Sequence, residues 1–183
     1  MWAGKSTTLA GGLVSISGGV GDVNTGGAVS VASGEGTATS SGVVSIRSSN
    51  SGASGVSGML VFSSGTAVLG NSGAIIIGTG AATSGRGGLV SISAGSGTSG
   101  VGGLVSMWAG KSTTLAGGLV SISGGVGTAN TGGAVSVASG EGTATSSGVV
   151  TIRSVNSGAS GVSGSLVFSS GTAVKGNSGA III

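Results

Sequence analysis

Residues 87–103 read GGLVSISAGSGTSGVGG, and this stretch contains the pattern that repeats along the whole chain. Gly88 and Gly103 each precede a burst of aliphatic residues. Glycines in this position, here called anchor glycines, recur at gaps of 15 residues, with two gaps of 16. The anchors are Gly12, Gly27, Gly42, Gly58, Gly73, Gly88, Gly103, Gly118, Gly133, Gly148, Gly164 and Gly179.

A longer repeat overlies the short one. Residues 1–77 match residues 107–183 at 71 of 77 positions, an offset of 106 residues that equals six gaps of 15 and one of 16. Seven short repeats therefore form one super-repeat. We expect one continuous array over residues 1–183, with a super-repeat at 1–106 and a partial second copy at 107–183.

Two columns of the repeat are apolar throughout: the second and the fourth positions after each anchor. A small polar residue usually separates them, and this alternation is typical of a strand with one buried face. β-branched residues dominate both columns, as strands favour, and the glycine content excludes helix. The sequence therefore predicts an all-β fold, a parallel β-solenoid with about 15 residues per coil and a rise of about 4.8 Å per coil.

The predicted core of this solenoid is the stack of the two apolar columns. Its members are Val14, Ile16, Val29, Val31, Val44, Ile46, Leu60, Phe62, Ile75, Ile77, Val90, Ile92, Val105 and Met107. The anchor glycine is expected to form a corner with positive φ. The ninth position after the anchor holds only Gly, Ser or Ala, which would let the two sides of a coil approach closely.

Composition excludes most chemistry. The 183 residues include 44 glycines and no histidine, cysteine or proline, so zinc sites and His-based triads cannot form. Nine charged residues give a net charge of +3 without a basic patch, and no apolar run is long enough for a membrane helix. We expect no enzyme activity, no catalytic, cofactor or metal site, and no nucleic-acid, membrane or small-molecule partner.

One stretch imitates a nucleotide-binding site. Gly4-Lys5-Ser6-Thr7 resembles the end of a phosphate-binding loop, and the same residues return at 110–113. The second copy places Val105 where the motif requires its first glycine, and no helix is expected to follow. The stretch returns because the super-repeat returns.

Several apolar side chains are expected to point outward, where they would contact a neighbouring chain or another part of the assembly. These predicted lateral contacts are Trp2, Trp108, Val61, Ile76, Leu13 and Leu89. Met1 aligns with Met107, a predicted core position, and Ile183 also falls in a predicted strand. We therefore expect the chain to be a window of a longer array, with self as its partner through end-to-end and lateral packing.

The strings at 87–103, at 41–58 (SGVVSIRSSNSGASGVSG) and at 36–44 (GTATSSGVV) carry a resemblance. They are similar to the long Gly/Ser/Thr-rich repeat proteins of algae and other protists, which are regarded as secreted or cell-surface proteins. This resemblance implies an extracellular or cell-surface location and a structural part, and it carries over no functional residues.

The leading functional hypothesis is a structural protein that forms an extracellular filament by β-solenoid stacking. One alternative is an adhesin or carbohydrate-binding stalk that uses Trp2 and Trp108 as sugar platforms. A second alternative is an ice-binding solenoid, for which Thr37-Ala38-Thr39 and its copy at 143–145 supply only one two-threonine step per super-repeat.

Overall fold

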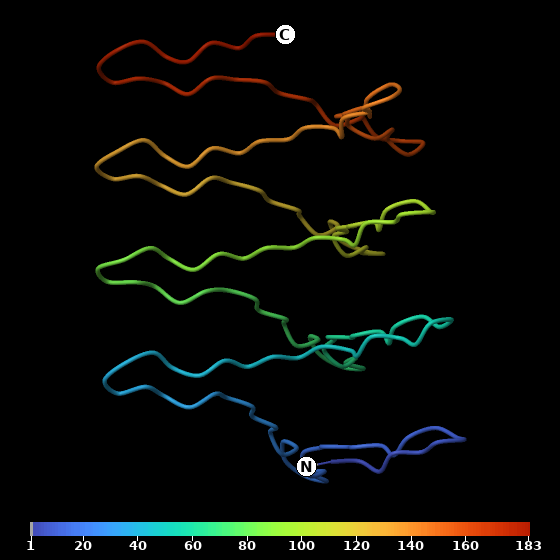
Figure 1. Cartoon of the computed structure of the whole chain (residues 1–183). Coiled ribbons are helices and arrows are strands. Elements are labelled where there is room, and N and C mark those ends of the chain that lie inside the picture. The colour runs from blue at the N-terminus through green and yellow to red at the C-terminus, as the bar shows by residue number, and fades with distance from the viewer. Residues whose placement is uncertain (1) are drawn as a thin grey trace. The chain divides into compact units, whose positions relative to one another are not determined.

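The computed structural model describes residues 2–183, so Met1 and its predicted core position lie outside the described residues. The chain divides into two units, unit 1 (Met1–Ser91) and unit 2 (Ile92–Ile183), which are described separately. Each unit is a series of narrow loops in which the backbone runs out to a bend and returns (Figure 1). Within a unit successive loops point in different directions, and every third loop points the same way.

No helix and no β-strand is present in residues 2–183; the only regular local features are bends and short turns. These recur with the spacing of the anchor glycines, and each of the ten without an inserted residue begins ten positions after an anchor or its equivalent position. The bends and turns comprise residues 7–9, 22–24, 37–39, 53–55, 68–70, 83–85, 98–100, 113–115, 128–130, 143–145, 159–161 and 174–176.

Most loops are closed at their base by one main-chain hydrogen bond. The anchor N–H donates to the carbonyl oxygen of the glycine eight residues earlier, over 2.8–3.0 Å. We call this contact the neck of the loop. The necks join Gly12 to Gly4, Gly27 to Gly19, Gly42 to Gly34, Gly103 to Gly95, Gly118 to Gly110, Gly133 to Gly125 and Gly148 to Gly140.

The prediction of an all-β parallel β-solenoid is wrong, because the described residues contain no strand. A solenoid would pair each residue with its equivalent about 15 positions along, in an uninterrupted ladder. At seven of the twelve anchors the N–H instead donates within its own loop, to the carbonyl oxygen eight residues back, and these loops make no ladder beyond that bond. The expected spacing of about 4.8 Å between coils and the expected assembly by solenoid stacking both required this ladder, so both are withdrawn with it.

The explanation for the anchor glycines is also corrected. Among the described residues only Gly176 has a positive φ, so the anchors are not left-handed corners. At several anchors glycine is needed because the two limbs of a loop approach closely at the neck. A Cβ on Gly27 would lie 2.9 Å from the amide nitrogen of Gly19, and one on Gly12 would lie 3.0 Å from that of Gly4.

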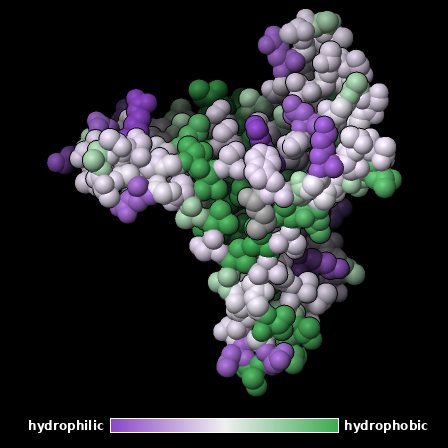
Figure 2. All heavy atoms as spheres, turned by 60° about the horizontal axis from the view of Figure 1, so that its bottom comes forward, coloured by the Kyte–Doolittle hydropathy of each residue, from purple (hydrophilic) through white to green (hydrophobic). Residues whose placement is uncertain are grey.

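The apolar bursts lie between the loops. Residues 13–18, for example, connect the loop 4–12 to the loop 19–27, and we call such a segment a connector. In Figure 2 green, apolar surface lies around the bases of the loops and also at the end of one loop, and purple, hydrophilic side chains lie mostly along the loops. The loops themselves carry exposed apolar residues such as Leu9, Leu69 and Val174, so apolar side chains are not confined to the connectors.

The connectors do not form a core. No side chain of residues 2–183 is buried, and the accessible surface is 17,737 Å². A folded monomer of this mass, 16.4 kDa, exposes about 7,500 Å², and its fully unfolded chain about 23,800 Å². The isolated chain thus retains roughly three quarters of the unfolded surface, and its conformation is set by local bonds rather than by burial.

Candidate assembly surface

The connector side chains differ regularly in exposure. Residues two positions after the anchor are 43–55% exposed, which is the lowest range among the large apolar residues of the chain. Residues four positions after the anchor are 57–75% exposed where another connector residue follows them, and Ile183 is fully exposed. Each connector therefore has a half-shielded face that carries the two apolar columns.

The residues predicted to stack as a core lie on this half-shielded face. Val14 and Val44 are the most shielded of them, and Ile77 is the most exposed. Because none is buried, the predicted stacks do not form an interior in the single chain. They form a partly open apolar surface that recurs in every repeat.

The predicted lateral residues are more exposed than the two apolar columns of the connectors, with one partial exception. Leu13, Leu89 and Ile76 are almost fully exposed. Val61 is less exposed than these three and resembles the residues of the half-shielded face. The connectors consequently present apolar atoms to solvent on both faces, and a lone soluble protein rarely keeps such a surface uncovered.

Both tryptophans project into solvent. Trp2 is 98% exposed and Trp108 is 89% exposed. The indole N–H of Trp108 donates to the hydroxyl oxygen of Ser106 on its own connector. The polar atom of Trp108 is therefore satisfied locally, while its ring faces stay open.

An apolar groove lies in unit 1 between two consecutive connectors. Its walls are Phe62 on one connector and Ile75, Ile76 and Ile77 on the next, and it encloses about 430 Å³. No charged or hydrogen-bonding side chain lines it. A smaller polar hollow of about 150 Å³ is formed by the four consecutive residues 47–50 and holds no cluster of ligating groups.

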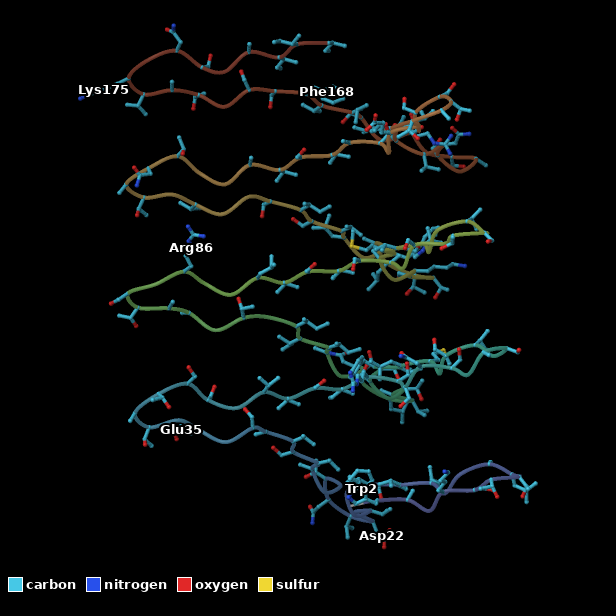
Figure 3. The ribbon with its side chains drawn as sticks, in the orientation of Figure 1. Trp2, Asp22, Glu35, Arg86, Phe168 and Lys175 are labelled. Atoms are coloured by element: carbon cyan, nitrogen blue, oxygen red, sulfur yellow. The ribbon has the colours of Figure 1, made fainter. Side chains whose placement is uncertain are left out.

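Charge is separated from the apolar connectors. Seven of the nine charged residues lie on loops, and the two exceptions, Arg47 and Arg153, lie at the ends of connectors. Figure 3 shows the separation in the loop whose bend carries Lys175, because Phe168 lies toward the inner end of the same loop. Residues 2–183 contain no group of three or more acidic, His or Cys residues that could hold a metal ion.

The least exposed residues are small, and most of them stand in a column whose small residues were expected to let two sides of a solenoid coil approach. Besides Gly18, which stands six positions after its anchor, the half-buried residues are Ser6, Gly36, Ser112 and Gly142, and these four stand nine positions after an anchor or its equivalent position. This position faces the inside of the bend. The Ser6 hydroxyl oxygen accepts hydrogen bonds from the backbone N–H groups of Leu9 (2.9 Å) and Thr8 (3.4 Å), and Ser112 repeats the arrangement.

The signal for this inner position was available in the sequence. Only Gly, Ser or Ala occurs nine positions after the anchor, a restriction attributed above to the approach of two solenoid sides. For the glycines of this column the structure gives a different cause: a Cβ on Gly127, for example, would lie 2.6 Å from the carbonyl oxygens of Asn130 and Thr131 across the bend.

No protein-family model, no curated protein and no solved structure matches the chain. Residues 2–183 contain no helix with the length and apolar character needed to cross a membrane.

Proposed function

We propose that the chain is a structural repeat segment that assembles with copies of itself into an extracellular or cell-surface filament. The observation that carries this proposal is the half-shielded apolar face of the connectors. It recurs in every repeat and is covered by nothing in the chain itself. The contacts of this assembly are between connectors and require no β-ladder.

Surface area supports self-association. A protein of this mass normally buries most of its unfolded surface, and this chain buries about a quarter. The hydrophobic effect favours covering the remainder, at about 25 cal/mol for each Å² of apolar surface removed from water. A second copy is a suitable cover because it presents the same apolar segments with the same spacing, as symmetric or repeating contacts require.

The separation of charge favours the same conclusion. The loops carry most of the charge and extend away from the connectors, so an assembly joined at the connectors keeps its charged groups in water. Charged side chains are depleted from the centres of protein interfaces for this reason. The absence of histidine and cysteine agrees with a structural part.

The exposed tryptophans favour a second candidate, an adhesin or stalk that binds carbohydrate. Trp2 and Trp108 each offer an uncovered indole face. Glycan-array binding that disappears in the Trp2→Ala, Trp108→Ala double variant would support this candidate. The ice-binding alternative has no such support, because Thr37 and Thr39 lie in a bend and the flat threonine ladder would need strands.

Two matched sets of four substitutions test the filament proposal. The first changes four connector valines, Val14, Val29, Val44 and Val90, to serine; they are 43–54% exposed. The control changes four loop valines that are 93–97% exposed, so both variants have the same composition. The control residues are Val20, Val23, Val56 and Val101.

Covering the open half of a valine contributes about 1 kcal/mol. The connector set should therefore weaken association by about 3–4 kcal/mol, or roughly 100- to 1,000-fold, measured by sedimentation and electron microscopy over a concentration series. The control set should assemble at nearly the parent concentration. A parent chain that stays monomeric at high concentration would contradict the proposal, as would equal losses in the two sets.

A further inference from the structure

The four aromatic residues of the chain occupy only two places in the super-repeat. Two are tryptophans, Trp2 and Trp108, and two are phenylalanines, Phe62 and Phe168. The members of each pair stand 106 residues apart. Every super-repeat thus supplies one exposed indole and one phenylalanine that belongs to a different connector.

The phenylalanine of unit 1 lines the apolar groove. Phe62 and Ile75 to Ile77 line a shallow, open groove of about 430 Å³, a volume within the range of sites that receive a small organic group. The same side chains return as Phe168 and Ile181 to Ile183. Because no polar side chain lines the groove, its occupant should be an apolar or aromatic group without an unsatisfied donor.

Trp108 meets this requirement. A buried indole normally needs a partner for its N–H, and Trp108 donates that hydrogen to Ser106 of its own connector. The ring can therefore enter an apolar groove without losing a hydrogen bond. Neither ring is docked within its own chain, since Trp2 and Trp108 are 98% and 89% exposed.

We propose that the Phe62–Ile77 groove of one copy receives the exposed tryptophan of a second copy of this chain. The proposal rests on the proposed self-assembly and names the contact that sets its register. Trp and Phe rings attract each other in edge-to-face or offset stacking. Two copies of net charge +3 repel at long range, so a neutral aromatic contact suits them better than an ionic one.

A contact of this kind uses only one of the two surfaces of each copy. The indole and the groove are different surfaces, so each copy that inserts its tryptophan into a neighbour still offers its own groove to the next. Contacts of this heterologous kind produce filaments when they do not close into rings. Tryptophan docking therefore links lateral contact to filament growth.

The area involved explains why the contact repeats. One docked tryptophan covers about 150–250 Å² of its own surface and a similar area of groove. That is well below the roughly 1,200 Å² of a stable interface. Because the tryptophan and the residues that line the groove both recur at a spacing of 106 residues, each super-repeat can supply one such contact, and linked contacts strengthen one another without new chemistry.

Tryptophan fluorescence tests the docking directly, because the chain has two tryptophans and no tyrosine. We expect the emission maximum of the purified chain to move to shorter wavelength as concentration rises, in parallel with assembly measured by sedimentation. The test variant is Ile76→Ser with Ile182→Ser. It should suppress the shift and raise the concentration for half-assembly by about tenfold or more, as loss of an interface hot spot does.

The matched control is Val43→Ser with Val149→Ser. These valines are also 106 residues apart, stand at exposed connector positions, and are 89% and 86% exposed against 89% and 92% for Ile76 and Ile182. None of the four supports the loops, so folding is not at issue. The control should keep the shift, and Trp2→Leu with Trp108→Leu should lose assembly to the extent that the groove variant does.

Two results would contradict the tryptophan docking, and they differ in whether the proposed self-assembly still stands. Filaments that form with unchanged tryptophan emission, or with equal sensitivity to the groove and control variants, refute the docking and leave self-assembly intact. A parent chain that remains monomeric at every concentration refutes both.

Discussion

The neck of a loop can be opened by one methyl group. Gly103 donates its N–H to the carbonyl oxygen of Gly95 over 2.8 Å. A Cβ at position 103 would lie 2.9 Å from the Cβ of Ala94 and 3.3 Å from both the nitrogen and the oxygen of Gly95. Since Cβ atoms almost never approach other atoms within 3.0 Å, we expect Gly103→Ala to separate the two limbs and break the bond.

The expected protection of the Gly103 amide from exchange is small, because the hydrogen bond at the neck is exposed to solvent. An intramolecular hydrogen bond contributes about 0.5–1.5 kcal/mol net, so the Gly103 amide should exchange with solvent about 2- to 13-fold more slowly than an unbonded glycine. Amide exchange measured by NMR on the monomeric chain reports this directly. In Gly103→Ala the protection at residue 103 should disappear.

Gly102→Ala is the control for this substitution. The nearest atom to a Cβ at position 102 is the oxygen of Gly95 at 4.0 Å, an ordinary contact. Both substitutions reduce the freedom of the unfolded chain equally, by the 0.4–1 kcal/mol typical of Gly→Ala, so the comparison isolates the neck. Equal protection at residue 103 in both variants, or an unprotected Gly103 in the parent chain, would refute the close approach of the limbs.

Three further results are expected from the same structure. Ser112→Ala should remove the acceptor for the N–H groups of Thr114 and Leu115 and speed amide exchange at Leu115 about 2- to 13-fold, whereas the control Ser121→Ala, at an exposed position, should not. Unchanged exchange at Leu115 would contradict the hydrogen bonding of Ser112 in the bend. Urea should unfold the monomer without a sharp transition. The free energy of unfolding should depend on urea concentration about a third as steeply as for an ordinary domain of this size, because the chain buries about 6,000 Å² instead of roughly 16,000 Å². A steep transition would indicate a buried core. Added salt should lower the concentration for assembly by screening the repulsion between copies of net charge +3, and light scattering that falls with salt would instead indicate ionic contacts.

The sequence predicts the positions of the loops better than their nature. The anchor glycines recur every 15 or 16 residues, and the bends recur with them. A repeated sequence must repeat its local structure, so this spacing follows from the sequence alone. What joins one repeat to the next does not, because a glycine amide can donate to the next coil or to a carbonyl eight residues back with equal ease.

The expectation of strands was wrong for a related reason. Alternation such as Val14-Ser15-Ile16 describes an extended backbone with two unlike faces, and the connectors do have these faces. A strand also requires a neighbour with which to exchange hydrogen bonds. The identity of that neighbour is not part of a period-two pattern, and in this chain the loops intervene between one connector and the next.

The candidate surface was predictable in its residues but not in its shape. Trp2, Trp108 and Ile76 were identified from their outward position in the pattern, and they are nearly fully exposed. The groove beside Ile76 was not anticipated, because it depends on how two consecutive connectors are placed. Phe62 was assigned to a core stack for the same reason, although it is more than half exposed at the groove wall.

Contacts within a single chain bury the half-shielded face only in part. Residues two positions after the anchor, such as Val14 and Val44, lose only about half of their exposure, whereas the hydrophobic effect rewards complete burial. A chain whose local bonds place an equivalent, partly covered aliphatic residue in every repeat has its apolar residues arranged but not yet covered. Contact with further copies would complete the burial that each repeat begins, and the array length multiplies that gain because every repeat adds an equivalent contact.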